Sequence, residues 1–274
     1  MLEKIYYVTD KRDIIISKEW PALLKLWNID FETLSSSKFS KSLISKECLF
    51  LCEVKKDASL IQEHGGFVII ACNEYNKGGD FSGFPFAVED FSIVPPIYYI
   101  KFWQRFMNIP WHIVDTNRCR IREMTPDDLD ALYELYEDKS VTRFMEDLFE
   151  DKQMEREYIE KYIQNVYSYF GFGTWVIIRK EDDKMIGRAG FNYRPEFDEP
   201  ELGFMLSAKY QNEGYAYEVC SQLMKYAKEE LGFEVVQALV EPKNTASIGL
   251  LKKLGFKEEK VYIVNNITYI RFLK

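Results

Sequence analysis

The sequence predicts an α/β (α+β) protein with a small α/β domain over residues 1–117 and a larger domain over residues 118–274. Short apolar runs suited to strands alternate with amphipathic stretches suited to helices along the whole chain. A length of 274 residues is long for one small domain and short for three. The apolar content of 47% is ample for a buried core, which argues against disorder.

The elements expected in the first domain are short. Strands are expected where apolar residues cluster, over Lys4–Asp10, Cys48–Val54 and Phe67–Glu74. One helix is expected over Asp57–Gly65, and another opens at Pro96 and closes at Pro110, because proline suits a first helical position and cannot continue a helix. The linker between the domains is expected from Pro110 to Cys119.

The second domain opens with a strand over Cys119–Met124 and a helix that has a clear start signal. Thr125 suits the N-cap, Pro126 suits the first helical position, and Asp128 completes a capping-box-like start. A second helical stretch covers about Lys152–Tyr169. Three strands, a helix, a strand, a helix and two closing strands are then expected over residues 174–181, 185–194, 201–208, 214–232, 235–242, 245–255, 256–264 and 267–274.

The net charge of −8 narrows the class of partner. Most of the acidic excess lies after residue 117. Nucleic acid is not expected as a partner, because phosphate binding needs a basic surface. A cationic substrate such as an amine is easier to accommodate on an acidic surface.

The chain has few cysteines and histidines, and the spacing of the cysteines fits no metal-binding motif. The five cysteines are odd in number and are expected to be free thiols in a reducing compartment. The two histidines, His64 and His112, both lie early in the chain, which disfavours Ser-His-Asp chemistry and histidine-based metal sites, so no metal is expected. The N-terminus has no apolar signal core, and no apolar run approaches the length of a membrane span. The sequence therefore predicts a cytoplasmic protein with no membrane partner.

The stretch "YQNEGYAYEVCSQLMKYAKEELG", residues 210–232, places a glycine-containing turn between a strand and an amphipathic helix. The first turn of a helix has unpaired N–H groups and a partial positive charge, so it is a site for a phosphate, most naturally a pyrophosphate. Gly214 lets the turn wind tightly, and Ala216 leaves room for a ligand. No Gly-Lys-Ser/Thr follows, which disfavours a Walker loop and ATP.

Two motifs in this part of the chain carry a specific resemblance. "QNEGYA" is similar to the Q/R-x-x-G-x-G/A acetyl-CoA loop of the GNAT N-acetyltransferase superfamily. Downstream, "VEPKNTASIGLLKKLGF" resembles the N-x-x-S segment of the branch that contains ribosomal-protein N-terminal, spermidine and some aminoglycoside acetyltransferases. The resemblance covers residues 119–274 and implies a mixed, mostly antiparallel, splayed sheet flanked by helices.

The resemblance also implies a donor site for acetyl-CoA as cosubstrate. The amides of the loop would hold the pyrophosphate, and the strand before it would splay from its neighbour to pair with the pantetheine arm and to offer one N–H to the thioester oxygen. Asn244 matches the asparagine that holds the pantetheine amide. The cofactor-binding residues expected on this basis are Phe204, Met205, Leu206, Gln211, Asn212, Glu213, Gly214, Tyr215, Ala216 and Asn244.

Two residues are candidates for catalysis. Glu201, where this branch often carries a glutamate, would take the proton of the amine directly or through a water; the alternatives are an ammonium anchor or an exposed acid at the end of a strand. Ser247 is a candidate acid for the leaving thiolate, or a small residue that lets its helix approach the cofactor. Many family members carry a tyrosine four residues later, where this chain has Leu251.

The expected function is acetyl-CoA-dependent N-acetyl transfer to a primary amine by direct attack in a ternary complex. A protein N-terminus, a polyamine, an aminoglycoside and an amino-acid-like metabolite are all compatible acceptors. The alternative is a catalytically weak CoA-binding sensor or interaction module, which the leucine at position 251 favours. A homodimer is compatible with either.

The first domain carries a fainter resemblance. "CEVKKDASLIQEHGGFVIIA" is similar to a strand–acid–helix–Gly–strand passage of haloacid-dehalogenase-type phosphatases. The nucleophile of that family lies in a DxD motif after its first strand, where this chain reads "VTDKRD". The sequence therefore disfavours phosphatase activity, and a packing, regulatory or dimerisation role is expected for this domain.

Overall fold

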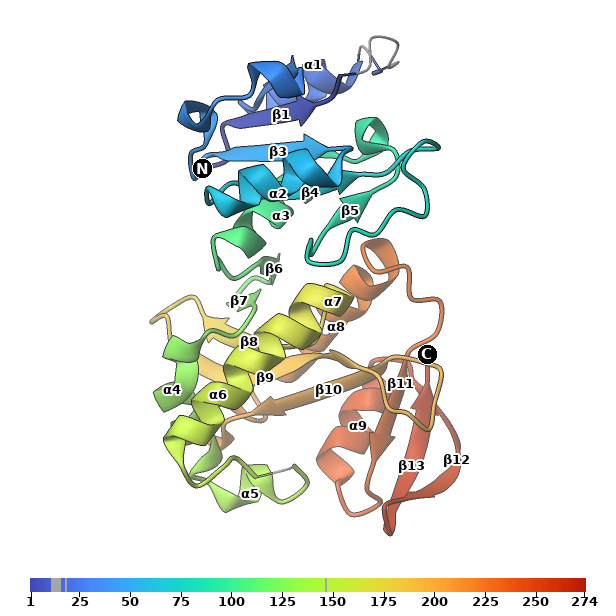
Figure 1. Cartoon of the computed structure of the whole chain (residues 1–274). Coiled ribbons are helices and arrows are strands. Elements are labelled where there is room, and N and C mark those ends of the chain that lie inside the picture. Colours follow the sequence, from blue (N-terminus) through green and yellow to red (C-terminus); the bar gives the residue numbers. More distant parts are fainter. Residues whose placement is uncertain (11–15, 18, 146) are drawn as a thin grey trace. The chain divides into compact units, whose positions relative to one another are not determined.

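The computed structural model of the chain describes residues 1–10, 16–17, 19–145 and 147–274, and it divides into two compact units, Met1–Ile109 and Pro110–Lys274 (Figure 1). The segment expected as a linker belongs to the second unit. Strand β6 (His112–Asp115) pairs with β7 (Cys119–Arg122), so its backbone groups are bonded within that unit's sheet. The expected linker is therefore wrong. A four-residue edge strand is too short to show the apolar alternation that would mark it in the sequence.

The first unit is built on a parallel sheet. Within the described residues this sheet has five strands in the order β2-β1-β3-β4-β5, and all of its pairings are parallel. Its strands are β1 (Lys4–Val8), β2 (Asp30–Leu34), β3 (Cys48–Cys52), β4 (Phe67–Ala71) and β5 (Ala87–Val88). Three helices of this unit, α1 (Glu19–Leu26), α2 (Lys55–Glu63) and α3 (Pro96–Phe106), pack on the sheet.

Both faces of this parallel sheet are buried. On one face Ile5 packs with Trp20 of α1 and Tyr99 of α3, and on the other face Val8 packs with Ile61 of α2. Strands that are buried on both faces show nearly continuous apolar runs, which is why β1, β3 and β4 could be predicted. Strand β2 is an edge strand that is largely exposed, and neither it nor α1 was predicted from the sequence. The passage "VTDKRD" lies partly outside the described residues.

The second unit is built on a larger, mixed sheet. Within the described residues it has eight strands in the order β12-β13-β11-β10-β9-β8-β7-β6, and every pairing is antiparallel except that of β10 with β11. The strands that follow β7 are β8 (Thr174–Arg179), β9 (Met185–Asn192), β10 (Glu201–Leu206), β11 (Gln237–Val240), β12 (Lys257–Val264) and β13 (Ile267–Leu273). The predicted α/β class with a mostly antiparallel sheet is confirmed.

Helices flank this sheet (Figure 1). The first begins with the predicted capping box of Thr125 and Asp128, and a short 3-10 turn leads into it. Helix α8 buries Cys220, Leu223 and Ala227 in the core, so the amphipathic pattern predicted for this helix is confirmed there. The helices are α4 (Leu129–Tyr136), α5 (Lys139–Thr142), α6 (Lys152–Tyr162), α7 (Ser168–Phe170), α8 (Tyr215–Glu229) and α9 (Thr245–Lys253), with a π-helical turn over Ile163–Tyr167.

Candidate functional site

The sheet of the second unit opens between β10 and β11. Strand β10 pairs with β9 along its whole length, from Glu201 to Leu206. Within the described residues, its register with β11 consists of one residue pair, Glu201 with Gln237. The edge of β10 beyond that pair therefore presents backbone N–H and C=O groups in the middle of a sheet.

A buried polar network holds the closed end of this opening. The Gln237 N–H donates to the carbonyl of Pro200 over 2.9 Å, and its side-chain Nε2 donates to the carbonyl of Glu199 over 2.9 Å. Its Oε1 accepts from Nε of Arg271 over 2.7 Å. Arg271 also forms ion pairs with Glu199 and Glu259. Because each buried group in this network has a partner, the point where the two strands separate is well defined.

The strand residues Phe204, Met205 and Leu206 lie beside this opening. Met205 and Leu206 are buried and Phe204 is half-buried. Met205 packs with Leu135 and Val141 on one face of the sheet, and Leu206 belongs to the main core. Their side chains thus anchor β10 while its backbone edge toward β11 stays available.

The loop before α8 ends next to this strand and leaves the helix N-terminus bare. Gly214 is the N-cap, with φ 84° and ψ 0°, and no side chain caps the helix. This left-handed conformation strains any residue with a Cβ, which explains the glycine. Gln211, Asn212, Glu213 and Gly214 are exposed, Ala216 is half-buried and Tyr215 is buried.

Arg118, which was not predicted as a site residue, contacts this loop and supports it. Its Nη1 donates to the carbonyl of Glu213 over 3.1 Å, and its guanidinium lies 3.9 Å from the centre of the Tyr215 ring. Its Nε and its backbone N–H both donate to the carboxylate of Glu218, over 2.7 and 2.9 Å. Arg118 is one hundred positions from Glu218 in the chain, so no local pattern could have indicated the contact.

Glu201 is buried, with an exposed fraction of 7%. The interpretation of this residue as an exposed acid at a strand end is therefore wrong. Its two carboxylate oxygens accept hydrogen bonds from Nε and Nη2 of Arg194. Burial raises the pKa of Glu201 above its usual value, while Arg194 and the backbone N–H of Leu239 on β11 lower it in part.

Asn244 and Ser247 lie at the start of α9. Asn244 is the N-cap of this helix, and its Oδ1 accepts from the N–H of Ser247 over 3.1 Å. Both side chains are half-buried. Leu251, one turn farther along the helix, is fully buried in the core. The structure thus gives Asn244 a capping role and leaves its side-chain NH2 group to donate elsewhere.

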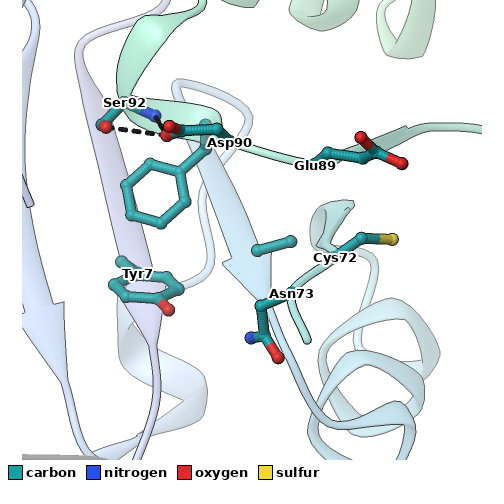
Figure 2. Close-up of a pocket in the computed structure, with 8 residues that line it drawn as sticks. Tyr7, Cys72, Asn73, Glu89, Asp90 and Ser92 are labelled. Carbon is teal, nitrogen blue, oxygen red and sulfur yellow. Dashed lines mark hydrogen bonds between the residues drawn. The ribbon is translucent and has the colours of Figure 1, made fainter. Parts of the chain in front are cut away.

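The first unit has a separate hollow of about 180 Å³ near the carboxyl ends of its parallel strands. Figure 2 shows Tyr7, Asn73 and Asp90 around it. The buried carboxylate of Glu53 accepts from Tyr7 Oη and Thr9 Oγ1, each over 2.7 Å, and from the side-chain amide of Asn73. This carboxylate ties the ends of β1, β3 and β4 together, which is a structural role.

The five cysteines are free thiols. Among the residues that the structure describes, no group of three or more histidine, cysteine, aspartate or glutamate side chains is placed to hold a metal ion. In the same residues, no helix is both long enough and apolar enough to cross a bilayer.

Comparison with known proteins gives the family. The profile of the acetyltransferase (GNAT) domain matches residues 118–257, about half of the chain. The chain belongs to the GNAT acetyltransferase family. The match lies within the second unit and contains the β10–β11 opening and the bare start of α8, and the first unit lies outside it.

Two curated relatives of the GNAT domain are named as N-acetyltransferases. The chain is 34% identical over 146 residues to the uncharacterized N-acetyltransferase p20 of Bacillus licheniformis, which covers 53% of this chain and 82% of the relative. It is 28% identical over 156 residues to the uncharacterized N-acetyltransferase YoaA of Bacillus subtilis (strain 168). That alignment covers 54% of this chain and 85% of the relative. The activity class is therefore that of an acetyltransferase.

Solved structures show the same fold for the GNAT domain. A proposed ribosomal-protein-serine acetyltransferase from Vibrio cholerae aligns with a TM-score of 0.52 at 20% identity, over 60% of this chain and 97% of that chain. The ribosomal-protein alpha-N-acetyltransferase RimL, solved in complex with coenzyme A, aligns with a TM-score of 0.52 at 16% identity, over 60% of this chain and 97% of that chain.

Proposed function

We propose that the GNAT domain transfers the acetyl group of acetyl-CoA to a primary amine, by direct attack of the amine in a ternary complex. The observation that carries this proposal is the opening between β10 and β11 next to the uncapped start of α8. A sheet that opens next to free helix amides suits a ligand with an anionic diphosphate and a long amide-containing arm. Coenzyme A has this combination.

The diphosphate is placed at the loop Gln211–Ala216. Its charge would meet the amides of the first turn of α8 and the positive end of the helix. Arg118 keeps the loop in this conformation and adds a positive charge nearby. The coenzyme A bound to the neighbour RimL supports this assignment, because that protein shares the fold.

The pantetheine arm is placed in the opening, along the free edge of β10. Phe204, Met205 and Leu206 would contribute backbone groups to the arm, and one N–H would face the thioester oxygen. That donor stabilises the negative charge which develops on the oxygen when the amine attacks. The side-chain NH2 of Asn244 supplies a further donor to the amides of the arm.

Glu201 is placed as the group that accepts the proton of the amine, directly or through a water. In this step the nitrogen forms a bond to the acetyl carbon, the carbon–sulfur bond breaks, the thiolate leaves and the amine loses a proton. A buried carboxylate whose pKa is raised is a better proton acceptor than an exposed one. Ser247, half-buried at the start of α9, is the candidate donor to the thiolate.

Direct attack is preferred over an acyl-enzyme because the cysteines of this domain are poor nucleophiles. Burial raises the pKa of the Cys119 thiol to about 11 and that of the Cys220 thiol to about 12. Both thiols are thus protonated near neutral pH, and the thiolate is the nucleophilic form.

The test is transfer of labelled acetyl groups from acetyl-CoA to a panel of amines, with peptide N-termini, polyamines, aminoglycosides and amino acids as members. We expect transfer to at least one class, and we expect Glu201→Gln to lower kcat by about 100-fold or more while CoA affinity is kept. The alternative, a CoA-binding sensor, is favoured by the fully buried Leu251. CoA binding without turnover on any amine would support the sensor, and no CoA binding at millimolar concentration would end both readings.

A further inference from the structure

One face of the β9–β10 pair carries an ordered row of residues. Directly opposed residues of antiparallel strands have side chains on the same face, and so do residues two apart along one strand. Asn192 is opposite Glu201, Gly190 is opposite Gly203, and Arg188 is opposite Met205. This face therefore has Glu201 toward one end, Arg188 toward the other and two glycines between them.

The space above Gly203 is open. No heavy atom lies within 4 Å of the position that a Cβ would take there, and Gly203 is half-buried. Its neighbour Gly190 differs, because a Cβ there would lie 1.9 Å from the carbonyl of Gly173. Gly203 thus leaves the surface of β10 uncovered at a point between Glu201 on the same strand and Arg188 on β9. Its backbone has no left-handed strain.

Arg188 differs from the other arginines in the strands of this sheet. It is half-buried, and within the described chain it forms no ion pair with a carboxylate. Its Nη1 contacts Oη of Tyr136 over 3.3 Å, whereas its Nε is buried and has no acceptor among the described residues. The other strand arginines each pair with a carboxylate, namely Arg120 with Asp183, Arg122 with Asp128, Arg179 with Asp182 and Arg271 with Glu199.

A cation that is partly removed from water and has an unsatisfied buried donor is costly for the fold, because a paired anion normally compensates for the lost hydration. Among the described residues no anion supplies this compensation, and Arg188 lies next to the strand that is assigned to the thioester. We propose that Arg188, assisted by Tyr136, binds a carboxylate of the acceptor. This inference deepens the proposed function and rests on it.

The length of the row indicates which kind of acceptor fits. Glu201 and Met205 are four residues apart along β10, which corresponds to about 13 Å between their Cα atoms. The amine and the carboxylate of a free amino acid are much closer than that. An extended peptide whose free N-terminus lies toward Glu201, and which has an acidic side chain within its first few residues, spans the distance across Gly203.

The charges of the row agree with such an acceptor. The Glu201 end has a carboxylate, which is also paired with Arg194, for the amine, and the Arg188 end has a guanidinium, in contact with Tyr136, for the acid. Arginine holds a carboxylate with two parallel hydrogen bonds, for which its unsatisfied Nε and an Nη are the suitable donors.

The first experiment compares amidated tetrapeptides that differ by one glutamate or glutamine at the second, third or fourth position, with free glutamate and glutamine as the small-molecule arm. We expect kcat/KM to be about 10- to 100-fold higher for the best glutamate peptide than for its glutamine partner. Arg188→Gln should abolish this preference by lowering kcat/KM for the glutamate peptide to about that of its glutamine partner. Arg120→Gln, on the same sheet but exposed, is the matched control and should keep the preference.

The second experiment needs no turnover. The same peptides are titrated calorimetrically into the protein saturated with CoA, using wild type, Arg188→Gln and Gly203→Leu, with CoA affinity and melting temperature measured for each. We expect Arg188→Gln to lose the glutamate preference in Kd, and Gly203→Leu to lose peptide binding with CoA affinity kept. A glutamate preference in binding without acetylation would contradict the proposed function and keep this inference.

Two outcomes would overturn the inference. One is a wild-type protein that does not distinguish glutamate from glutamine in the peptides or in the free amino acids, in rate or in Kd. The other is an Arg188→Gln variant in which kcat/KM falls, or Kd rises, by the same factor for both peptides of a pair, with CoA affinity unchanged. A preference for free glutamate over every peptide would retain Arg188 as the carboxylate site and exclude the peptide.

Discussion

Glu201 and Gln237 form the one register pair that joins β10 to β11 within the described residues. The backbone N–H of Leu239, farther along β11, helps to lower the pKa of Glu201 against the rise that burial causes. Glu201 thus stands where the two strands separate, next to the place assigned to the thioester.

Arg194 lowers the pKa of Glu201, so its removal should change how activity depends on pH. The guanidinium of Arg194 stabilises the charged carboxylate and opposes the rise in pKa that burial causes. Arg194→Gln removes this effect, so the pKa of Glu201 rises further. Activity that needs the charged carboxylate is lost as the pH falls through that pKa, and the acidic limb of kcat/KM should move to higher pH. A pH–rate profile checks this, and an unmoved limb would show that Glu201 is not the proton acceptor.

Gly214 should be needed for binding of the diphosphate. Gly214→Ala forces a residue with a Cβ into the left-handed conformation, which costs about 1–2 kcal/mol, although there is room for the methyl group itself. The loop should shift, and CoA affinity should fall. Gly232→Ala is the matched control, since Gly232 lies just beyond α8, has φ 68° and also has free space around it. It should lose similar stability and bind CoA normally; equal loss of affinity in both variants would count against the loop assignment.

Arg118 should affect CoA binding more than folding. Its ion pair with Glu218 is partly exposed, so Arg118→Gln should lower the free energy of unfolding by about 1 kcal/mol or less. The loop, however, loses the contacts to Glu213 and Tyr215 that keep its amides in place. We expect the Kd for CoA to rise about tenfold, measured by calorimetry against Arg120→Gln. Unchanged affinity would mean that the loop holds its shape without the brace.

A tyrosine at position 251 should not increase the catalytic rate. Leu251 is fully buried, so a tyrosine there has to displace core side chains, and overpacking of this kind costs about 1–3 kcal/mol. We predict a lower melting temperature for Leu251→Tyr and no gain in kcat. A rise in kcat would instead show that the tyrosine hydroxyl reaches the thiolate and that its absence limits the rate of the natural protein.

Features that depend on local pattern could be predicted from the sequence. The apolar stripe of α8, the capping box of Thr125 and Asp128 and the central strands of both sheets belong to this class. The edge strands β2, β5 and β6 were not predicted, because β2 is largely exposed and β5 and β6 are too short to show the alternation that marks a strand.

Features that depend on contacts between distant segments could not be predicted. The Arg118 brace joins residues about one hundred positions apart, and the pair of Arg194 with Glu201 joins two sides of a loop. That Arg188 has no carboxylate partner among the described residues depends on everything around it in space. Such contacts follow from the register of strands, which no single stretch of sequence encodes.

A crystal structure of the protein with bound CoA would locate the donor site. We predict that the diphosphate lies within hydrogen-bond distance of the amides of Asn212–Ala216 and that the pantetheine arm runs between β10 and β11. Coenzyme A bound at another surface, with β11 paired to β10 along its whole length, would rule out the proposed donor site.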